Sequence, residues 1–204
     1  MKVQFFNGAP SVPFGLFMGG FGVLPSAFAP KKPIAMVYDY RDFNNLEEIC
    51  TLATNAQHLI AWSMGVAIAS RIFTTQGFDR AIAINGTIAG IDSKFGIHPR
   101  LFRRTIESFD REVFARGCFG EDFGTYLSSK DMLIEELCAL ESFCTHTTSS
   151  YSLQWHEAYV SENDAIFSPI AQRLAWESYT KTNKDFILHT LTYPHFVFGA
   201  MEVL

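Results

Sequence analysis

Short runs of apolar residues recur along the chain and predict a series of buried β-strands. Several runs are apolar throughout, which is typical of parallel strands buried on both faces of a sheet. The predicted strands are Val3–Phe6, Phe14–Met18, Ile34–Tyr38, His58–Trp62, Arg80–Ile84, Trp155–Val160 and Phe186–His189. Covering helices are predicted at Leu46–Asn55, Gly65–Thr74 and Ile170–Thr180. This alternation predicts an α/β fold with a mostly parallel central sheet and helices on both faces.

Residues 97–148 interrupt the alternation, because they contain two helical patterns and no convincing strand. The stripe of the first predicted helix consists of Phe102, Ile106, Phe109 and Val113, at spacings of four, three and four. The second helix follows the capping-box sequence Ser128–Asp131, and its stripe consists of Leu133, Leu137, Leu140 and Cys144. We therefore expect one domain over residues 1–204, with 97–148 as a small helical cap inserted between strands of the sheet.

Composition and charge narrow the class of protein. The chain has 204 residues, 48% hydrophobic and 18% charged, which suits one domain with a full hydrophobic core. Its formal net charge of -5 argues against a nucleic-acid binder, since such proteins usually carry a basic excess. The four cysteines lie far apart without C-x-x-C spacing, so neither a zinc site nor a dense disulfide framework is predicted.

The N-terminal region superficially resembles a secretory signal, because Lys2 precedes an apolar stretch from Val12 to Ala29. Prolines and glycines break that stretch, so a short strand followed by a glycine-rich turn is the better interpretation. No segment is long and apolar enough to span a bilayer. We expect a cytoplasmic protein that binds neither membrane nor nucleic acid.

The segment from His58 to Ala67 has the pattern of a nucleophile elbow. An apolar strand leads directly into Ser63, and an apolar helix begins behind it. The usual signature is G-x-S-x-G, with small residues on either side of a tight turn. Ala61 replaces the first glycine and adds little bulk, while Gly65 retains the second. An ordinary helix N-cap would explain a serine alone, but strand, turn and helix together favour Ser63 as the nucleophile of an α/β-hydrolase fold.

A glycine-rich turn, Gly19–Gly22, follows the predicted strand Phe14–Met18. In this fold the oxyanion is held by two backbone amides, one after the nucleophile and one in a loop after an earlier strand. The first amide is that of Met64, and by position we assign the second to Phe21. Taken alone, the turn is better explained without a ligand; its position ahead of the elbow favours the oxyanion role.

The base and the orienting acid are expected later in the chain, in the order Ser, Asp or Glu, His. Asp164 lies in a polar turn after the penultimate predicted strand, and His195 follows the last one. We predict that His195 deprotonates Ser63 and that Asp164 fixes its tautomer. Glu162 in the same turn is the reserve acid, and Asp92 is a weaker reserve. The other five histidines lie in or beside strands or in the cap and are poorer candidates.

Arginines make the first predicted cap helix locally basic. Arg100, Arg104 and Arg111 are expected on the face opposite its apolar stripe. Such a patch attracts an acidic partner, for example an acyl carrier protein. A solvated helix face explains the same charges, with Glu107 placed to pair with Arg103 and Arg111 at spacing four. Charge alone favours the solvated face.

Longer motifs spread over most of the chain add a family resemblance. They are Tyr38–Asp42, Trp62–Gly65, Ala83–Thr87, Ile91-Asp92, Gly96-Ile97, Pro99 with Phe102 and Thr105, and Asp164–Phe167. Together they resemble the BioG-type pimeloyl-[acyl-carrier protein] methyl ester esterases, which are α/β-hydrolases of biotin synthesis. Members of that family remove the methyl group that caps the ω-carboxylate of a pimeloyl chain carried on acyl carrier protein.

This resemblance implies Ser63, Asp164 and His195 as the catalytic triad and a carrier protein that meets the cap arginines. The implied products are pimeloyl-acyl carrier protein and methanol, with the amides of Met64 and Phe21 holding the oxyanion. No metal or organic cofactor is expected. An esterase or thioesterase for another acyl substrate is the alternative, since a fold does not set the substrate. A non-catalytic binding protein on this scaffold is the third possibility.

Overall fold

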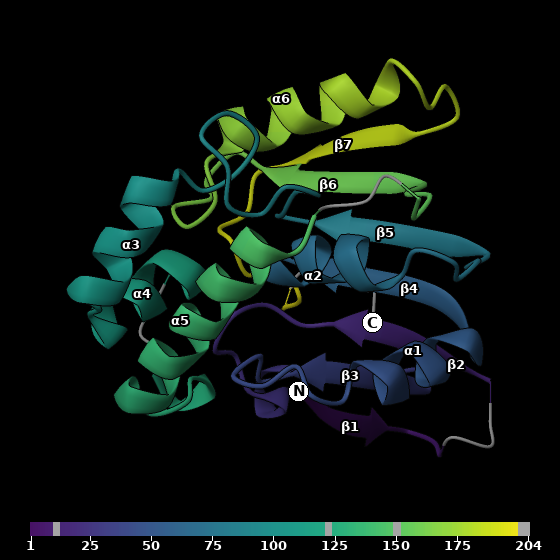
Figure 1. Cartoon of the computed structure of the whole chain (residues 1–204), viewed down its shortest axis with the longest axis horizontal. Coiled ribbons are helices and arrows are strands. Elements are labelled where there is room, and N and C mark those ends of the chain that lie inside the picture. Colours follow the sequence, from purple (N-terminus) through teal and green to yellow (C-terminus); the bar gives the residue numbers. More distant parts are fainter. Residues whose placement is uncertain (10–12, 121–123, 149–151, 200–204) are drawn as a thin grey trace.

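The computed structural model describes residues 1–9, 13–120, 124–148 and 152–199 and centres on one sheet (Figure 1). Its strands are β1 (Lys2–Phe6), β2 (Phe14–Met18), β3 (Ile34–Tyr38), β4 (Ala56–Trp62), β5 (Arg80–Ile84), β6 (Glu157–Ser161) and β7 (Ile187–Leu191). They lie in the order β1-β3-β2-β4-β5-β6-β7, and only the β1–β3 pair is antiparallel. Each predicted strand is confirmed, with ends that differ by at most two residues.

The two faces of the sheet are covered differently. One face carries α1 (Leu46–Thr54), α2 (Met64–Ile72) and α6 (Pro169–Thr180). From β3 onward every crossover moves in the same direction across the sheet, and right-handed connections then fall on one face. The β2–β3 connection runs the other way and covers the opposite face with a short 3-10 helix, η1 (Pro25–Ala27). There Phe28 packs against Phe17, Trp62 and Phe198, which seals that side of the core.

The chain between β5 and β6 forms a helical layer, which we call the helical insertion. Its α-helices are α3 (Pro99–Glu107), α4 (Arg111–Phe119) and α5 (Lys130–His146), with a 3-10 turn η2 (Gly124–Tyr126) before α5. Figure 1 shows them together at the end of the sheet toward which the parallel strands run. The predicted core stripe of α5 is buried at Leu133, Leu137 and Leu140. Ser129 precedes α5 as predicted, although its side chain makes no capping hydrogen bond.

The prediction of one helix carrying both Phe102 and Val113 is wrong. Helix α3 ends at Glu107, and Asp110 starts α4 by accepting hydrogen bonds from the backbone amides of Glu112 and Val113. An aspartate in that position is a strong helix start, and here it outweighs the apolar spacing. As a result Val113 is 57% exposed, while Phe102 is buried.

Candidate active site

Ser63 occupies the sharp turn between β4 and α2. Its backbone dihedrals are φ 58° and ψ -128°, a conformation that costs a non-glycine residue on the order of 1–3 kcal/mol. The Ser63 amide donates to the carbonyl of Ile84 on β5 at 2.9 Å, which anchors the turn. A Cβ on Gly65 would lie 2.3 Å from the carbonyl oxygen of Met18, so α2 can approach the end of β2 only with glycine there. The strand, turn and helix predicted around Ser63 are therefore present.

The imidazole of His195 joins Ser63 to Asp164. Its Nε2 is 2.8 Å from Ser63 Oγ, and its Nδ1 is 2.8 Å from Asp164 Oδ2. The exposed fractions of the three residues are only 4% for Ser63, 1% for His195 and 6% for Asp164. The carboxylate fixes Nδ1 as the protonated ring nitrogen, which leaves Nε2 able to accept the serine proton. The structure thus brings together the three residues predicted as a triad.

Asp164 is itself held in one orientation by other donors. Its Oδ1 accepts hydrogen bonds from the backbone amides of Ile166 at 2.9 Å and Phe167 at 2.7 Å. Its Oδ2 also accepts the side-chain amide of the buried Gln172 from α6, at 3.0 Å. The carboxylate therefore cannot turn away from His195 without breaking several hydrogen bonds.

The two reserve acids are engaged elsewhere. Glu162 forms a surface ion pair with Arg173 at 2.8 Å. Asp92 accepts hydrogen bonds from the backbone amides of Lys94 and Phe95, both at 2.7 Å. Of the three acids considered from the sequence, Asp164 is the one that contacts the imidazole.

Two buried side chains hold the main chain of His195. Its carbonyl accepts a hydrogen bond from Trp62 Nε1 at 3.0 Å and another from Asn85 Nδ2 at 2.8 Å. Asn85 has a positive φ of 45°, and it exchanges two further hydrogen bonds with Ser161 at the end of β6. Sequence reasoning placed Asn85 only within a family motif. The signal that could have identified it is a polar, left-handed-tolerant residue directly after the apolar strand β5.

The turn predicted to form the oxyanion hole lies against Ser63. A Cβ on Gly20 would be 3.0 Å from Ser63 Cβ, so the turn and the elbow are in van der Waals contact. Met64 is the first residue of α2, and the first amides of a helix have no partner within it. Phe21 and Met64 both border the cavity that Ser63 and His195 line. The two residues predicted to supply the oxyanion donors therefore border the same cavity as the serine.

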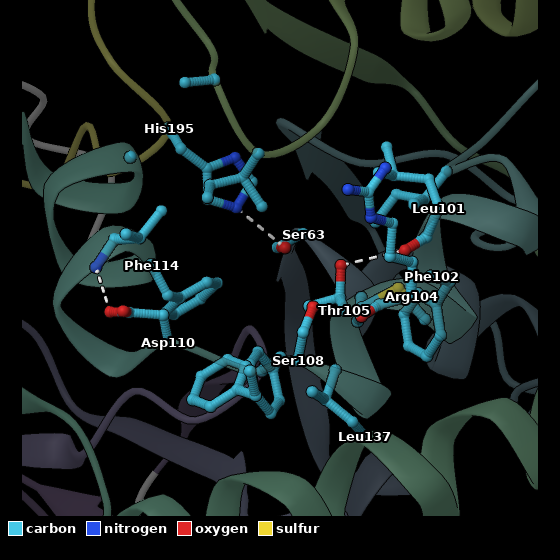
Figure 2. Close-up of a pocket in the computed structure, with 18 of the residues that line it drawn as sticks. Ser63, Leu101, Phe102, Arg104, Thr105, Ser108, Asp110, Phe114, Leu137 and His195 are labelled. Atoms are coloured by element: carbon cyan, nitrogen blue, oxygen red, sulfur yellow. Dashed lines mark hydrogen bonds between the residues drawn. The ribbon is translucent and has the colours of Figure 1, made fainter.

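The helical insertion encloses a cavity of about 430 Å³ over Ser63, within the range of about 300–1,000 Å³ typical of small-molecule sites. Figure 2 shows Ser63 and His195 facing each other, with insertion side chains around them. The large apolar side chains that the insertion adds to the lining are Ile97, Leu101, Phe102, Phe109, Val113, Phe114 and Leu137. The polar residues that it adds are Arg104, Thr105, Ser108 and Asp110. Such walls suit a methylene chain whose end reaches the serine.

The arginines that were predicted to form one patch are divided between two elements. Arg100 and Arg104 are exposed on α3, and Arg104 also borders the cavity. Arg103 pairs with Glu141 of α5 at 2.9 Å, and not with Glu107 as the alternative of a solvated helix face had it.

Arg111 was predicted on the outer face of the first cap helix, and this prediction is wrong. It is the first residue of α4, because Asp110 starts a new helix there. Its guanidinium donates to the backbone carbonyls of Leu127 at 3.1 Å and Ser128 at 3.0 Å. Arg111 thus joins α4 to the segment before α5 inside the helical insertion.

Comparison with known proteins identifies the family. The model of a family described as pimeloyl-ACP methyl esterase BioG matches residues 1–201. The chain belongs to the BioG family. A Bacteroides fragilis (strain 638R) protein named malonyl-[acyl-carrier protein] O-methyltransferase is 31% identical to it over 182 residues. That match covers 80% of this chain and only 36% of the longer relative.

Solved structures agree with this placement. The crystal structure of BioG from Haemophilus influenzae matches 99% of this chain and 97% of that chain, with a TM-score of 0.81 and 26% identity. The enol-lactonase from Burkholderia xenovorans LB400 matches 95% of this chain and 88% of its own, with a TM-score of 0.65 and 11% identity, a likeness of fold alone. The predicted α/β-hydrolase fold and family resemblance are confirmed, and the BioG family is one of carboxylic ester hydrolases.

In ranges 1–9, 13–120, 124–148 and 152–199, no group of three or more histidine, cysteine, aspartate or glutamate side chains is arranged to hold a metal ion. Within the same ranges, no helix is long and apolar enough to cross a membrane.

Proposed function

We propose that this BioG-family protein hydrolyses the methyl ester of pimeloyl-acyl carrier protein, releasing methanol and the carrier-bound acid in biotin synthesis. The observation that carries the proposal is the hydrogen-bonded chain from Asp164 through His195 to Ser63 beside a largely apolar cavity. Family membership supplies the substrate class. The Bacteroides fragilis relative adds support, because its name describes methyl transfer to a carrier-bound malonyl group.

The first half of the proposed reaction forms an acyl-enzyme. Ser63 Oγ attacks the ester carbonyl carbon while His195 Nε2 takes the hydroxyl proton. The carbonyl oxygen becomes an oxyanion, which the backbone amides of Met64 and Phe21 stabilise. The tetrahedral intermediate then collapses, the bond to the methoxy oxygen breaks, and His195 returns its proton to the departing methanol. The pimeloyl chain is left on Ser63 as an ester.

The second half releases the acid. A water molecule gives a proton to His195 Nε2 and attacks the Ser63 ester, and the same amides hold the new oxyanion. Collapse returns the proton to Ser63 Oγ and frees the carboxylic acid, which is still attached to the carrier at its other end. Asp164 keeps the imidazole in the required tautomer in both halves.

In this proposal residues 97–148 act as a cap on a single domain of residues 1–204, and the carrier protein docks on it. An acyl carrier protein is acidic, and Arg100 and Arg104 are exposed on α3 beside the cavity. Leu101 between them is 56% exposed and offers an apolar contact at the same place. Arg111 is less suited to this role, because its guanidinium already binds two backbone carbonyls.

The test is hydrolysis of pimeloyl-acyl carrier protein methyl ester by the wild type, Ser63→Ala and Ser108→Ala. Ser108 also lines the cavity but bonds to the carbonyl of Arg104, so its variant is a matched control. We expect Ser63→Ala to lower kcat by roughly 10⁶-fold, as loss of a serine nucleophile does in other hydrolases, and Ser108→Ala to keep most activity. Cleavage of simple esters without cleavage of the carrier substrate would favour another acyl substrate. Absence of both activities in the wild type would favour a binding protein.

A further inference from the structure

Glu136 of α5 is a buried carboxylate with no part in the proposed chemical steps. Glu136 is only 2% exposed. The carboxylate accepts a hydrogen bond from the backbone amide of Gly22 at 3.2 Å, and the backbone amide of Tyr40 also favours its ionised form. Gly22 follows β2 and Tyr40 follows β3, so one side chain of the helical insertion interacts with two loops of the sheet. Burial raises the pKa of Glu136 to about 7. Keeping it ionised therefore destabilises the fold, which suggests a role in function.

The loop that Glu136 holds is the turn predicted to form the oxyanion hole. At the start of this turn, the Tyr40 hydroxyl donates to the carbonyl of Gly19 at 2.8 Å. At its end, Glu136 accepts the amide of Gly22, whose carbonyl accepts the amide of Ser128 at 3.1 Å. The turn is thus held on both sides, and the contacts at its end come from the insertion.

Phe21 lies between these two attachment points. Its ring makes edge-on contacts with Phe109 and Phe114 of the insertion, at centroid distances of 5.9 and 5.1 Å. Because the turn is held at both ends, the direction of the Phe21 amide within it is fixed. An oxyanion requires donors that are fixed in this way. We propose that Glu136 is a positioning residue that holds the Phe21 amide for the transition state and so links the insertion to catalysis. This inference rests on the proposed esterase function.

Ionised and protonated Glu136 would hold the loop differently. A carboxylate can accept from both amides, whereas a protonated acid presents one hydroxyl donor, which opposes an amide donor. Other groups bear on this ionisation from each neighbouring element. Asp39 raises the pKa of Glu136 and Arg41 lowers it, while the charge of Glu136 also acts on the Met1 ammonium and the Tyr40 hydroxyl. Loss of the ionised form below neutral pH should therefore weaken turnover.

The experiment compares Glu136→Gln with the wild type and with Glu135→Gln, using the carrier substrate between about pH 5.5 and 8.5. Glu135 is the preceding residue on α5 and pairs with Arg41 at the surface, so its variant removes a charge without removing a contact to the Gly19–Gly22 turn. Glutamine mimics protonated Glu136 at every pH. At about pH 8.5 we expect Glu136→Gln to lower kcat by about tenfold with little change in KM. At about pH 5.5 the two rates should converge, because Glu136 of the wild type is then largely protonated and resembles the glutamine of the variant.

A deficit that is constant across the pH range, or a change in KM alone, would overturn the positioning role. If the glutamine variant fails to fold, the Gly22 amide resonance of the wild type decides instead. It should titrate with a midpoint near pH 7, following the pKa of Glu136, and a resonance that does not move would overturn the inference. Hydrolysis that survives Ser63→Ala would overturn the proposed function and this inference with it. Ser63-dependent hydrolysis that Glu136→Gln leaves unchanged would overturn the inference alone.

Discussion

The carboxyl ends of the parallel strands, called the sheet edge below, carry Ser63, and the helical insertion covers them. The two regions are built in different ways. At the sheet edge, buried polar side chains bind backbone groups at fixed positions, as Asp164 and Asn85 do. In the insertion, the residues that face the cavity are mostly apolar, and Arg100 lies outside in solvent. The sheet can therefore set the geometry of the reaction, while the insertion sets which acyl chain and which partner reach it.

After Ser63→Ala, Asp164→Asn should lower activity most, because it changes the acid that contacts His195 at the sheet edge. An amide can offer its NH₂ group to His195 Nδ1 and stabilise the wrong tautomer, although the surrounding donors still hold the side chain in place. We expect kcat to fall by about 10⁴-fold with an unchanged fold. Steady-state kinetics and circular dichroism measure the two properties.

The control for this variant is Glu162→Gln. Glu162 lies in the same turn and pairs with Arg173 at the surface, so its loss should leave kcat within about twofold of the wild type. Equal losses in the two variants would contradict the assignment of the acid.

Two glycine-to-alanine substitutions, one at the sheet edge and one in the helical insertion, compare how tightly these regions are packed. At Gly65 a Cβ would meet the Met18 carbonyl at 2.3 Å, and backbone atoms cannot easily move. At Gly117 of α4 it would meet the flexible end of Ile166 at 3.0 Å. We expect the free energy of unfolding to fall by about 3 kcal/mol for Gly65→Ala. For Gly117→Ala we expect a change within about 1 kcal/mol, because the gain in helix propensity offsets the contact. Urea denaturation would contradict this if both losses were similar.

Glu136→Gln should change how stability depends on pH. The folded pKa of Glu136, about 7, lies above the ordinary value of 4.5. The folded state therefore binds the extra proton, and the free energy of unfolding of the wild type falls as pH rises from 4.5 to 7. This contribution is at most about 3 kcal/mol, and glutamine lacks it. The melting temperature of the variant relative to the wild type should rise from about pH 5 to 8; a pH-independent difference would contradict the shift.

Arg104→Glu tests the outer surface of the insertion and has the smallest expected effect. It should lower kcat/KM for the carrier-bound ester by about tenfold at low salt, with less effect at high salt. Hydrolysis of a small p-nitrophenyl ester should be unchanged. Lys184→Glu is the charge-matched control. Lys184 is exposed in the α6–β7 connection, at the amino-terminal ends of the strands and away from the insertion. Equal effects of the two variants would place the carrier elsewhere.

The strands and the elbow could be predicted from the sequence because buried parallel strands are marked by apolar runs. Chain order then identified Asp164 and His195, since loops at the ends of parallel strands meet at one edge. The role of Asn85 could not be predicted, because its partners Ser161 and His195 are distant in the chain and become neighbours only in the folded sheet.

The insertion was predicted less well, for local and tertiary reasons. The apolar spacing that joins Phe102 to Val113 fits one helix, but the capping hydrogen bonds of Asp110 divide it. Arg111 was expected in solvent and instead binds carbonyls of the segment before α5. The role of Glu136 could not be predicted, because nothing in its neighbouring sequence reveals the amide that it meets.

The most direct test of the proposed activity is to identify which bond of the carrier substrate breaks. Pimeloyl-acyl carrier protein methyl ester would be incubated with the wild type and with Ser63→Ala, and the intact carrier protein would be weighed by mass spectrometry. We expect the wild type to leave the acyl chain on the carrier and lower its mass by one CH₂ group, with equimolar methanol, and Ser63→Ala to leave the mass unchanged. A carrier that returns as its free thiol would contradict methyl ester hydrolysis and indicate a thioesterase.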